Sequence, residues 1–169
     1  MLEVKTLARN ELTDRLAGWT GSLFQMNTPR NEMNIVLISC VKTKAQHRCK
    51  AKNLYVSTWF RYAWQYTQSL KPNRIFILSA KHGLLDPDDV IDPYQETLNK
   101  KSVAEIRVWA EQVLEKLGQK TKLQNDHFTI LAAVKYRKHI VPKLLHHEVP
   151  MEKKRFGQQL QWLKKQCAK

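Results

Sequence analysis

The chain has 169 residues, a length that suits one domain able to bury most of the surface its unfolded chain exposes. Its formal net charge is +14, from 29 Lys and Arg against 15 Asp and Glu. No apolar run approaches the roughly 20 residues of a membrane span, and the first residues lack the pattern of a signal peptide. We therefore expect a cytoplasmic protein with no membrane partner, and the charge favours a polyanionic partner over a neutral metabolite.

The first part of the chain is predicted to stand apart from the rest. Leucines and one tryptophan recur there at close to helical spacing, until Asn-Thr-Pro-Arg-Asn interrupts the pattern at residues 27–31. We predict an N-terminal helical extension over residues 1–32 and an α/β domain over residues 33–169.

Three short runs rich in Ile, Val and Leu follow in this second part. Runs that are apolar at successive positions are typical of strands buried on both faces, as in parallel sheets. They alternate with amphipathic segments, which predicts a single layered α/β domain with a mainly parallel sheet flanked by helices. The predicted strands cover residues 35–39, 74–79 and 128–133, the predicted helices cover residues 54–70, 102–117, 135–145 and 158–165, and one or two short strands are expected within residues 84–91 or 147–150.

Two local signals define the middle of the chain. Residues 80–94 are rich in Pro and Asp, which predicts a long irregular loop of the kind that often carries function. Ser102 and Glu105 have the spacing of a capping box, and Gly118 is expected to end the helix that they begin.

A lysine follows each of the three predicted strands: Lys42, Lys81 and Lys135. Parallel strands end at a common edge, and the crevice there is where ligands bind in such sheets. We therefore expect the three ammonium groups to share one crevice and to bind an anion. Ser39 and Lys44 belong to the same segment as Lys42 and are predicted to take part.

The distribution of charge favours nucleic acid as the anion. Residues 33–85 contain no Asp or Glu but nine Lys and Arg, interleaved with aromatic residues such as Tyr55. Basic and aromatic residues together form surfaces that follow a phosphate backbone and stack on bases. We expect this stretch to present a field of one sign, although most of its aromatic residues are expected to form the core face of one helix.

Candidate catalytic groups cluster after the second strand. Ser79 and His82 precede Gly83, whose freedom to adopt a positive φ would allow a close ligand approach, and Asp86 follows. A nucleophile or general base drawn from Ser79, His82 and Asp86 is one interpretation. Turn formation explains the aspartates of this loop equally well.

No metal or cofactor site is predicted. Cys40, His47 and Cys49 lack the paired spacing of a zinc site, and the glycines of a phosphate-binding P-loop are missing. The odd number of cysteines, without disulfide-like spacing, fits a reducing compartment.

Five segments together resemble a family of uncharacterised bacterial and phage domains, and more distantly the YaaA peroxide-stress proteins. They are Ser39-Cys-x-Lys-x-Lys44, Leu54-Tyr-x-Ser57, Leu78-Ser-Ala-Lys-His-Gly-Leu-Leu-x-Pro87, Ile91-x-Pro-Tyr-x-x-Thr-Leu98 and Gly157-Gln-Gln-Leu-x-Trp-Leu163. The resemblance covers residues 34–163. Through these motifs it implies further binding residues: Tyr55, Ser57, Tyr94, Thr97, Gln158 and Gln159. The more distant similarity to YaaA-like sequences adds Lys135 and Tyr136.

The resemblance also implies a function, because YaaA-like proteins are associated with DNA binding and the wider group has been compared with uracil-DNA-glycosylase-like folds. We expect a nucleic-acid-binding protein, with DNA favoured over RNA, that has a nucleotide or base pocket at the strand ends and acts as a base-excising N-glycosylase. The alternatives are a non-catalytic DNA-binding module and an enzyme acting on a small phosphorylated metabolite. Gln95 stands where related sequences often have Asp, which favours binding without turnover.

Overall fold

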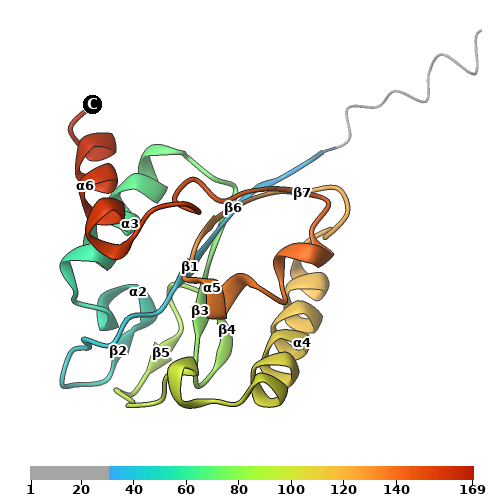
Figure 1. Cartoon of the computed structure of the whole chain (residues 1–169), viewed down its shortest axis with the longest axis horizontal. Helices are drawn as coiled ribbons and strands as arrows, with labels where there is room; N and C mark the ends of the chain where they lie inside the picture. Colours follow the sequence, from blue (N-terminus) through green and yellow to red (C-terminus); the bar gives the residue numbers. More distant parts are fainter. Residues whose placement is uncertain (1–30) are drawn as a thin grey trace, which may run out of the picture. The chain divides into compact units, whose positions relative to one another are not determined.

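A five-stranded sheet lies at the centre of the computed structural model, which describes residues 31–169 (Figure 1). The helical extension predicted over residues 1–32 falls almost entirely outside this range. The sheet has the order β4-β3-β1-β6-β7, in which β4 is antiparallel to β3 and the other neighbours are parallel. The strands are β1 (Asn34–Ser39), β3 (Arg74–Ser79), β4 (Gly83–Leu85), β6 (His127–Leu131) and β7 (His146–Glu148).

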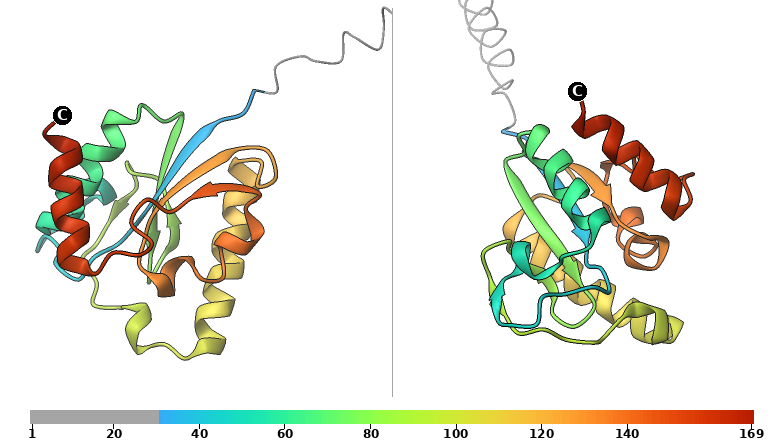
Figure 2. Two further views of the ribbon diagram at one scale, coloured as in Figure 1. Left: turned by 45° about the horizontal axis from the view of Figure 1, so that its top comes forward. Right: turned by 90° about the vertical axis from the view of Figure 1, so that its left-hand side faces the viewer.

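Helices cover both faces of this sheet, as Figures 1 and 2 show. The helices α3 (Thr58–Ser69) and α6 (Phe156–Cys167) lie side by side on one face, and α4 (Val103–Lys120) lies on the other. The remaining elements are short: α2 (Ala51–Leu54), α5 (Val134–Arg137), the 3-10 helices η1 (Leu98–Lys100) and η2 (Val141–Lys143), and the pair β2 (Cys49–Lys50) and β5 (Val90–Ile91). The predicted class, a layered α/β domain with a mainly parallel sheet, is confirmed.

The core is built on the central strand. Leu37 of β1 is fully buried and lies opposite Phe76 of β3 and Ile130 of β6, which are buried as well. Burial on both faces explains why these strands are apolar at successive positions. β1 begins one residue before its predicted start, and β3 has its predicted limits. β6 begins at His127, one residue early, and ends at Leu131 rather than Ala133.

The loop predicted over residues 80–94 contains two of the short strands that were expected nearby. After Ser79 the chain turns through Gly83, whose φ is +73°, and β4 runs back along β3 with Leu85 opposite Ile77. The chain therefore returns toward the amino end of β3 before β5 pairs with β2. This reversal places Asp86, directly after β4, toward the amino end of β3 and away from the carboxyl edge of the sheet.

Three predicted helices have different limits in the structure. The aromatic helix begins at Thr58, capped by Ser57, whose Oγ accepts a hydrogen bond of 3.1 Å from the Phe60 N–H. The helix predicted over residues 135–145 is divided into α5 and η2, with Pro142 in the first turn of η2. Ser102 and Glu105 form the expected capping box of α4, but that helix passes through Gly118 and continues to Lys120.

The two glycines Gly83 and Gly118 predict opposite effects of the same substitution. Gly83→Ala should lower the free energy of unfolding by about 1–2 kcal/mol, because a side chain at φ +73° is strained. Gly118→Ala should raise it by about 0.5–1 kcal/mol, since alanine favours the helix and the new Cβ would lie 3.7 Å from Leu123 Cδ1, an ordinary contact. Urea unfolding followed by circular dichroism measures both, and changes of the same sign would contradict the assignment of these two backbone conformations.

Candidate functional site

Three hydroxyl groups form a buried chain at the carboxyl edge of the sheet. The Tyr94 hydroxyl lies 2.8 Å from Ser79 Oγ and 2.8 Å from the Tyr55 hydroxyl, within hydrogen-bond distance of both. All three side chains are buried. Ser79 is the last residue of β3, Tyr55 follows α2, and Tyr94 lies in the segment after β5. Hydrogen bonds therefore join three segments that are distant in the sequence.

Lys44 places a positive charge beside this chain of hydroxyls. Its ammonium donates to the backbone oxygens of Val41 and Lys42, at 3.0 and 3.3 Å, and lies 4.3 Å from the centre of the Tyr94 ring. The ring face is the electron-rich side, so the contact is a cation–π interaction. Partial burial lowers the pKa of Lys44 from its usual value. The ammonium is thus held by the fold, whereas most surface lysines are free to move.

His82 borders the same ring. Its imidazole meets Tyr94 edge to face, with ring centres 5.4 Å apart, and its backbone N–H donates to Ser79 Oγ at 3.1 Å. Nε2 of His82 is buried and has no hydrogen-bond partner among the residues that the structure describes. We call the group formed by Lys44, Tyr55, Ser79, His82 and Tyr94 the strand-end site.

The electrostatics make this site neutral in its interior. Burial is the main cause that raises the pKa of Tyr55 and of Tyr94 far above the usual value for tyrosine, so both hydroxyls stay protonated. Burial, followed by the nearby Lys81 charge, lowers the pKa of His82. The imidazole is therefore uncharged at neutral pH, and the site offers hydrogen-bond donors and acceptors beside one ammonium group.

A second contact joins the neighbouring strand ends. The Cys40 thiol, after β1, lies 3.3 Å from the Tyr136 hydroxyl, after β6. The chain leaves β1 toward β3 and leaves β6 toward β7, so these two strands flank the point where the connections diverge, which is the usual ligand position in open α/β sheets. Trp109 of α4 packs edge to face on Tyr136 and donates to the Ser79 backbone oxygen at 2.9 Å.

A hollow of about 390 Å³ opens beside Ser79. Its lining combines the lysines Lys81 and Lys101, the carboxylates Glu96 and Glu105, and the Trp109 ring. Glu105 is occupied as part of the α4 capping box, whereas the Glu96 side chain is exposed. The charge of Glu96 acts on His82 and opposes the pKa decrease that burial causes. Glu96 is thus a carboxylate available to this hollow, and the Asp89 charge acts on His82 in the same direction.

The predicted site residues fall into three groups in the structure. The first group is the strand-end site, whose five residues contact one another. Tyr136 lies at the adjoining strand end, and the left-handed Gly83 lies in the turn after Ser79. Exposed side chains at the same edge are Lys42, Lys81 and Lys135, of which Lys135 donates to the Asn99 backbone oxygen at 3.2 Å. Ser39, the last residue of β1, is buried.

The third group supports the backbone. Ser57 and Thr97 cap α3 and η1. Gln158 Oε1 accepts from the Arg155 N–H at the start of α6. Gln159 Oε1 accepts from Trp59 Nε1 at 3.2 Å, which fixes α6 against α3.

Asp86, predicted as a catalytic candidate, is not brought to Ser79 and His82. It follows β4 and makes ion pairs with Arg74, at the start of β3, and with Lys120, at the end of α4. Because β4 runs antiparallel to β3, Asp86 lies about three residues, or roughly 10 Å, from Ser79 along the strand.

Two residues of this region were not predicted. Glu96 belongs to the Pro-Tyr-Gln-Glu-Thr segment, and its position two residues after Tyr94 was an available signal. Trp109 carries no such signal, because its spacing in α4 is that of a core residue and only the fold places its N–H on Ser79.

The expected field of one sign over residues 33–85 is partly wrong. Acidic residues from the segment after β4 pair with several basic residues of that stretch: Arg48 with Asp92, Lys50 and Lys52 with Asp88, and Arg74 with Asp86. Lys42 and Lys81, in contrast, make no ion pair with another described residue and stay exposed. Lys42 and Lys81 therefore leave uncompensated positive charge beside the strand-end site.

Comparison with known proteins identifies the chain at the level of a family. Residues 35–165 match the model of DUF6884, described as a family of unknown function. The chain belongs to the DUF6884 family. No curated protein and no solved structure matches it.

The part of this DUF6884 protein that the structure describes contains no group of three or more His, Cys, Asp or Glu side chains able to hold a metal ion. Within residues 31–169, no helix is long and apolar enough to cross a membrane.

The low pKa of His82 predicts a pH dependence of stability. Below pH 6.5, the ordinary histidine value, the unfolded chain binds a proton that folded His82 does not, so the free energy of unfolding should fall as the pH decreases toward the folded pKa. In His82→Gln, the free energy of unfolding should therefore fall less over this pH range than in the unaltered protein. Urea unfolding of both proteins between pH 7.5 and pH 5 measures it, with the other five histidines common to both. An equal decrease in the two proteins would show that His82 is not buried as described.

Proposed function

We propose that the protein binds nucleic acid and that the strand-end site receives a nucleotide or base from it. The observation that carries the proposal is the arrangement of neutral hydrogen-bonding groups inside the site, with the unpaired lysines Lys42 and Lys81 exposed at its edge. A base offers donors, acceptors and a flat ring, whereas the backbone that carries it offers phosphates. The interior of the site suits the first and its edge suits the second.

Three further observations support the proposal. The net charge of +14 is larger than a small phosphorylated metabolite requires. The carboxyl edge of a parallel sheet is the usual ligand position in this class of fold. The resemblance of the motifs to YaaA-like proteins, which are associated with DNA binding, points to the same partner.

Salt dependence tests the proposed phosphate contacts. In Lys42→Ala/Lys81→Ala, the slope of log K against log salt for a DNA duplex should decrease by about 0.9 for each lost contact, or about 1.8 for both. Fluorescence anisotropy of a labelled oligonucleotide at several salt concentrations measures the slope.

The matched control is Lys122→Ala/Lys143→Ala. These exposed lysines lie at the opposite edge of the sheet, where Gln124 Nε2 donates to the Lys143 backbone oxygen and Lys122 precedes β6. The control removes the same charge, so equal slopes for the two double variants would contradict a role for the strand ends. Absence of DNA binding by the unaltered protein would overturn the proposed function.

A second candidate function is hydrolysis of the bond between a base and its sugar, in which water adds to the sugar carbon and the base leaves with a proton. The unpartnered Nε2 of neutral His82, with the Glu96 carboxylate nearby, favours this candidate because together they could orient and deprotonate water. Chromatography should detect free base released from damaged or modified DNA by the unaltered protein, and at least 100-fold less from His82→Gln. DNA binding without release would leave a non-catalytic binding module.

A further inference from the structure

The segment that ends the chain has a charge pattern of its own. Residues 153–169 contain six Lys and Arg and no Asp or Glu. None of these basic side chains makes an ion pair with another residue in the described part of the chain. The acidic residues just before the segment are engaged elsewhere, since Glu152 pairs with Arg137 and Glu148 accepts a hydrogen bond from Thr129. The segment therefore carries uncompensated positive charge.

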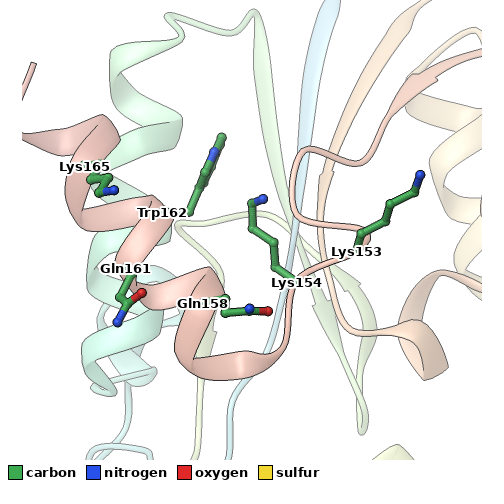
Figure 3. Close-up of a pocket in the computed structure, with 6 residues that line it drawn as sticks. All are labelled: Lys153, Lys154, Gln158, Gln161, Trp162 and Lys165. Carbon is green, nitrogen blue, oxygen red and sulfur yellow. The ribbon is translucent and has the colours of Figure 1, made fainter.

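This charge surrounds a shallow hollow of about 270 Å³ on α6. Its lining consists of Lys153, Lys154, Gln158, Gln161, Trp162 and Lys165. Figure 3 shows Trp162 from the helix and Lys154 from the preceding loop extending in the same direction, with the Gln158 amide near one end of the hollow. Lys165 lies farther along the helix, and Lys153 points away from Trp162. We call this surface the α6 hollow.

The helix arranges these side chains in a single row. Gln158, Gln161, Trp162 and Lys165 follow the spacing i, i+3, i+4 and i+7, which places them on one face of α6. The Trp162 ring is half-buried and packs edge to face on Tyr66 of α3, with ring centres 5.0 Å apart. The indole is thus fixed in position while part of it stays open to solvent.

The two faces of the sheet differ in charge. On one face, α3 and α6 together contain no acidic residue. On the other face, α4 carries three Glu against three Lys and Arg. A polyanion is therefore attracted to the α3 and α6 face more than to the α4 face.

We propose that the α6 hollow binds one nucleotide of a single-stranded nucleic acid, with the base on Trp162 and the adjoining phosphates on Lys154 and Lys165. An aromatic ring between ammonium groups is the arrangement by which proteins bind single strands, since every base can stack and every linkage carries a charge. The exposed Gln161 amide, and Nε2 of Gln158, whose Oε1 already accepts from the Arg155 N–H, supply hydrogen bonds to a base edge. This inference rests on the proposed nucleic-acid function and adds a second contact surface to it.

The α6 hollow and the strand-end site are linked through the chain. Gln159, next to Gln158, is hydrogen-bonded to Trp59 at the start of α3, and Trp59 lies four residues after Tyr55 of the strand-end site. The α6 hollow is smaller than the usual 300–1,000 Å³ of a small-molecule pocket, which fits part of a longer ligand better than a free metabolite.

Binding of a labelled oligothymidine and of a duplex of equal length by the full chain tests this inference. The unaltered protein should bind the single strand more tightly. Trp162→Leu should weaken single-strand binding by about 5- to 150-fold with an unchanged salt slope, because it removes stacking but no charge. Lys154→Ala/Lys165→Ala should lower the single-strand salt slope by about 0.7 for each phosphate contact, or about 1.4 in total.

Two further variants separate stacking and charge from folding. Trp162→Tyr keeps an aromatic ring and should bind within a few-fold of the unaltered protein. Gln161→Glu places a negative charge in the α6 hollow at an exposed position, where it does not disturb the core, and should weaken binding. The Lys122→Ala/Lys143→Ala control removes two charges at the amino edge of the sheet, and the α6 lysine variant should lower the slope more than this control.

The outcomes distinguish this inference from the proposed function. If the α6 variants bind oligothymidine like the unaltered protein while Lys42→Ala/Lys81→Ala does not, the α6 hollow is not a binding surface and the proposed function stands. If the unaltered protein binds neither oligonucleotide, both proposals fail. Equal or tighter binding of the duplex, or a larger effect of the α6 variants on vesicles containing phosphatidylserine than on oligothymidine, would overturn the assignment to single strands.

Discussion

The hydrogen-bonded chain Ser79–Tyr94–Tyr55 is the interaction on which the candidate site depends. Ser79 belongs to a strand fixed by pairing on both sides, but Tyr55 and Tyr94 lie in segments with little regular structure of their own. Since a buried hydroxyl without a partner costs about 1–3 kcal/mol, each of the three constrains the others. Lys44 and His82 take their positions from the Tyr94 ring that this chain holds in place.

Around the uncharged hydroxyl and imidazole groups of the site, some lysines form ion pairs with aspartates and others form none. The acidic segment after β4 neutralises the side of the domain formed by β2 and β5, as the Lys50 and Lys52 contacts with Asp88 show. Lys42, Lys81 and the lysines of α6, in contrast, make no ion pair with another described residue. Surface ion pairs contribute little to stability, so the main effect of this pairing is to determine where the protein attracts an anion.

The sequence predicted those parts of the structure that depend on local patterns. Buried strands such as β3 require continuous apolar residues, and the Ser102 and Glu105 cap requires only neighbours three residues apart. The end of α4 was predicted wrongly because glycine ends a helix only where the chain needs a left-handed residue, and α4 continues to Lys120 without one. That requirement is set by the path of the chain after the helix.

The site was predictable to the extent that strand direction determines it. Ser79 and Lys81 could be placed at one edge because parallel strands share their carboxyl ends, and motif membership added Tyr55 and Tyr94. The position of Asp86 could not be inferred from its closeness to Ser79 and His82 in the sequence. The three-residue strand β4 runs antiparallel to β3 and places Asp86 toward the other end of β3. The charge of Glu96, in contrast, acts on the pKa of His82, although Glu96 is fourteen residues away in the chain.

The separation of neutral and charged groups has a consequence for recognition. Moving a charged group out of water costs several kcal/mol, so phosphate contacts are best made by lysines that remain exposed, such as Lys42 and Lys165. Groups that distinguish one base from another must exclude water to discriminate, and the buried Tyr94 hydroxyl and the unpartnered His82 Nε2 meet that condition without burying a charge. Under the proposed function, the exposed lysines supply affinity that depends on salt, and the buried hydroxyl and imidazole groups supply selectivity that does not.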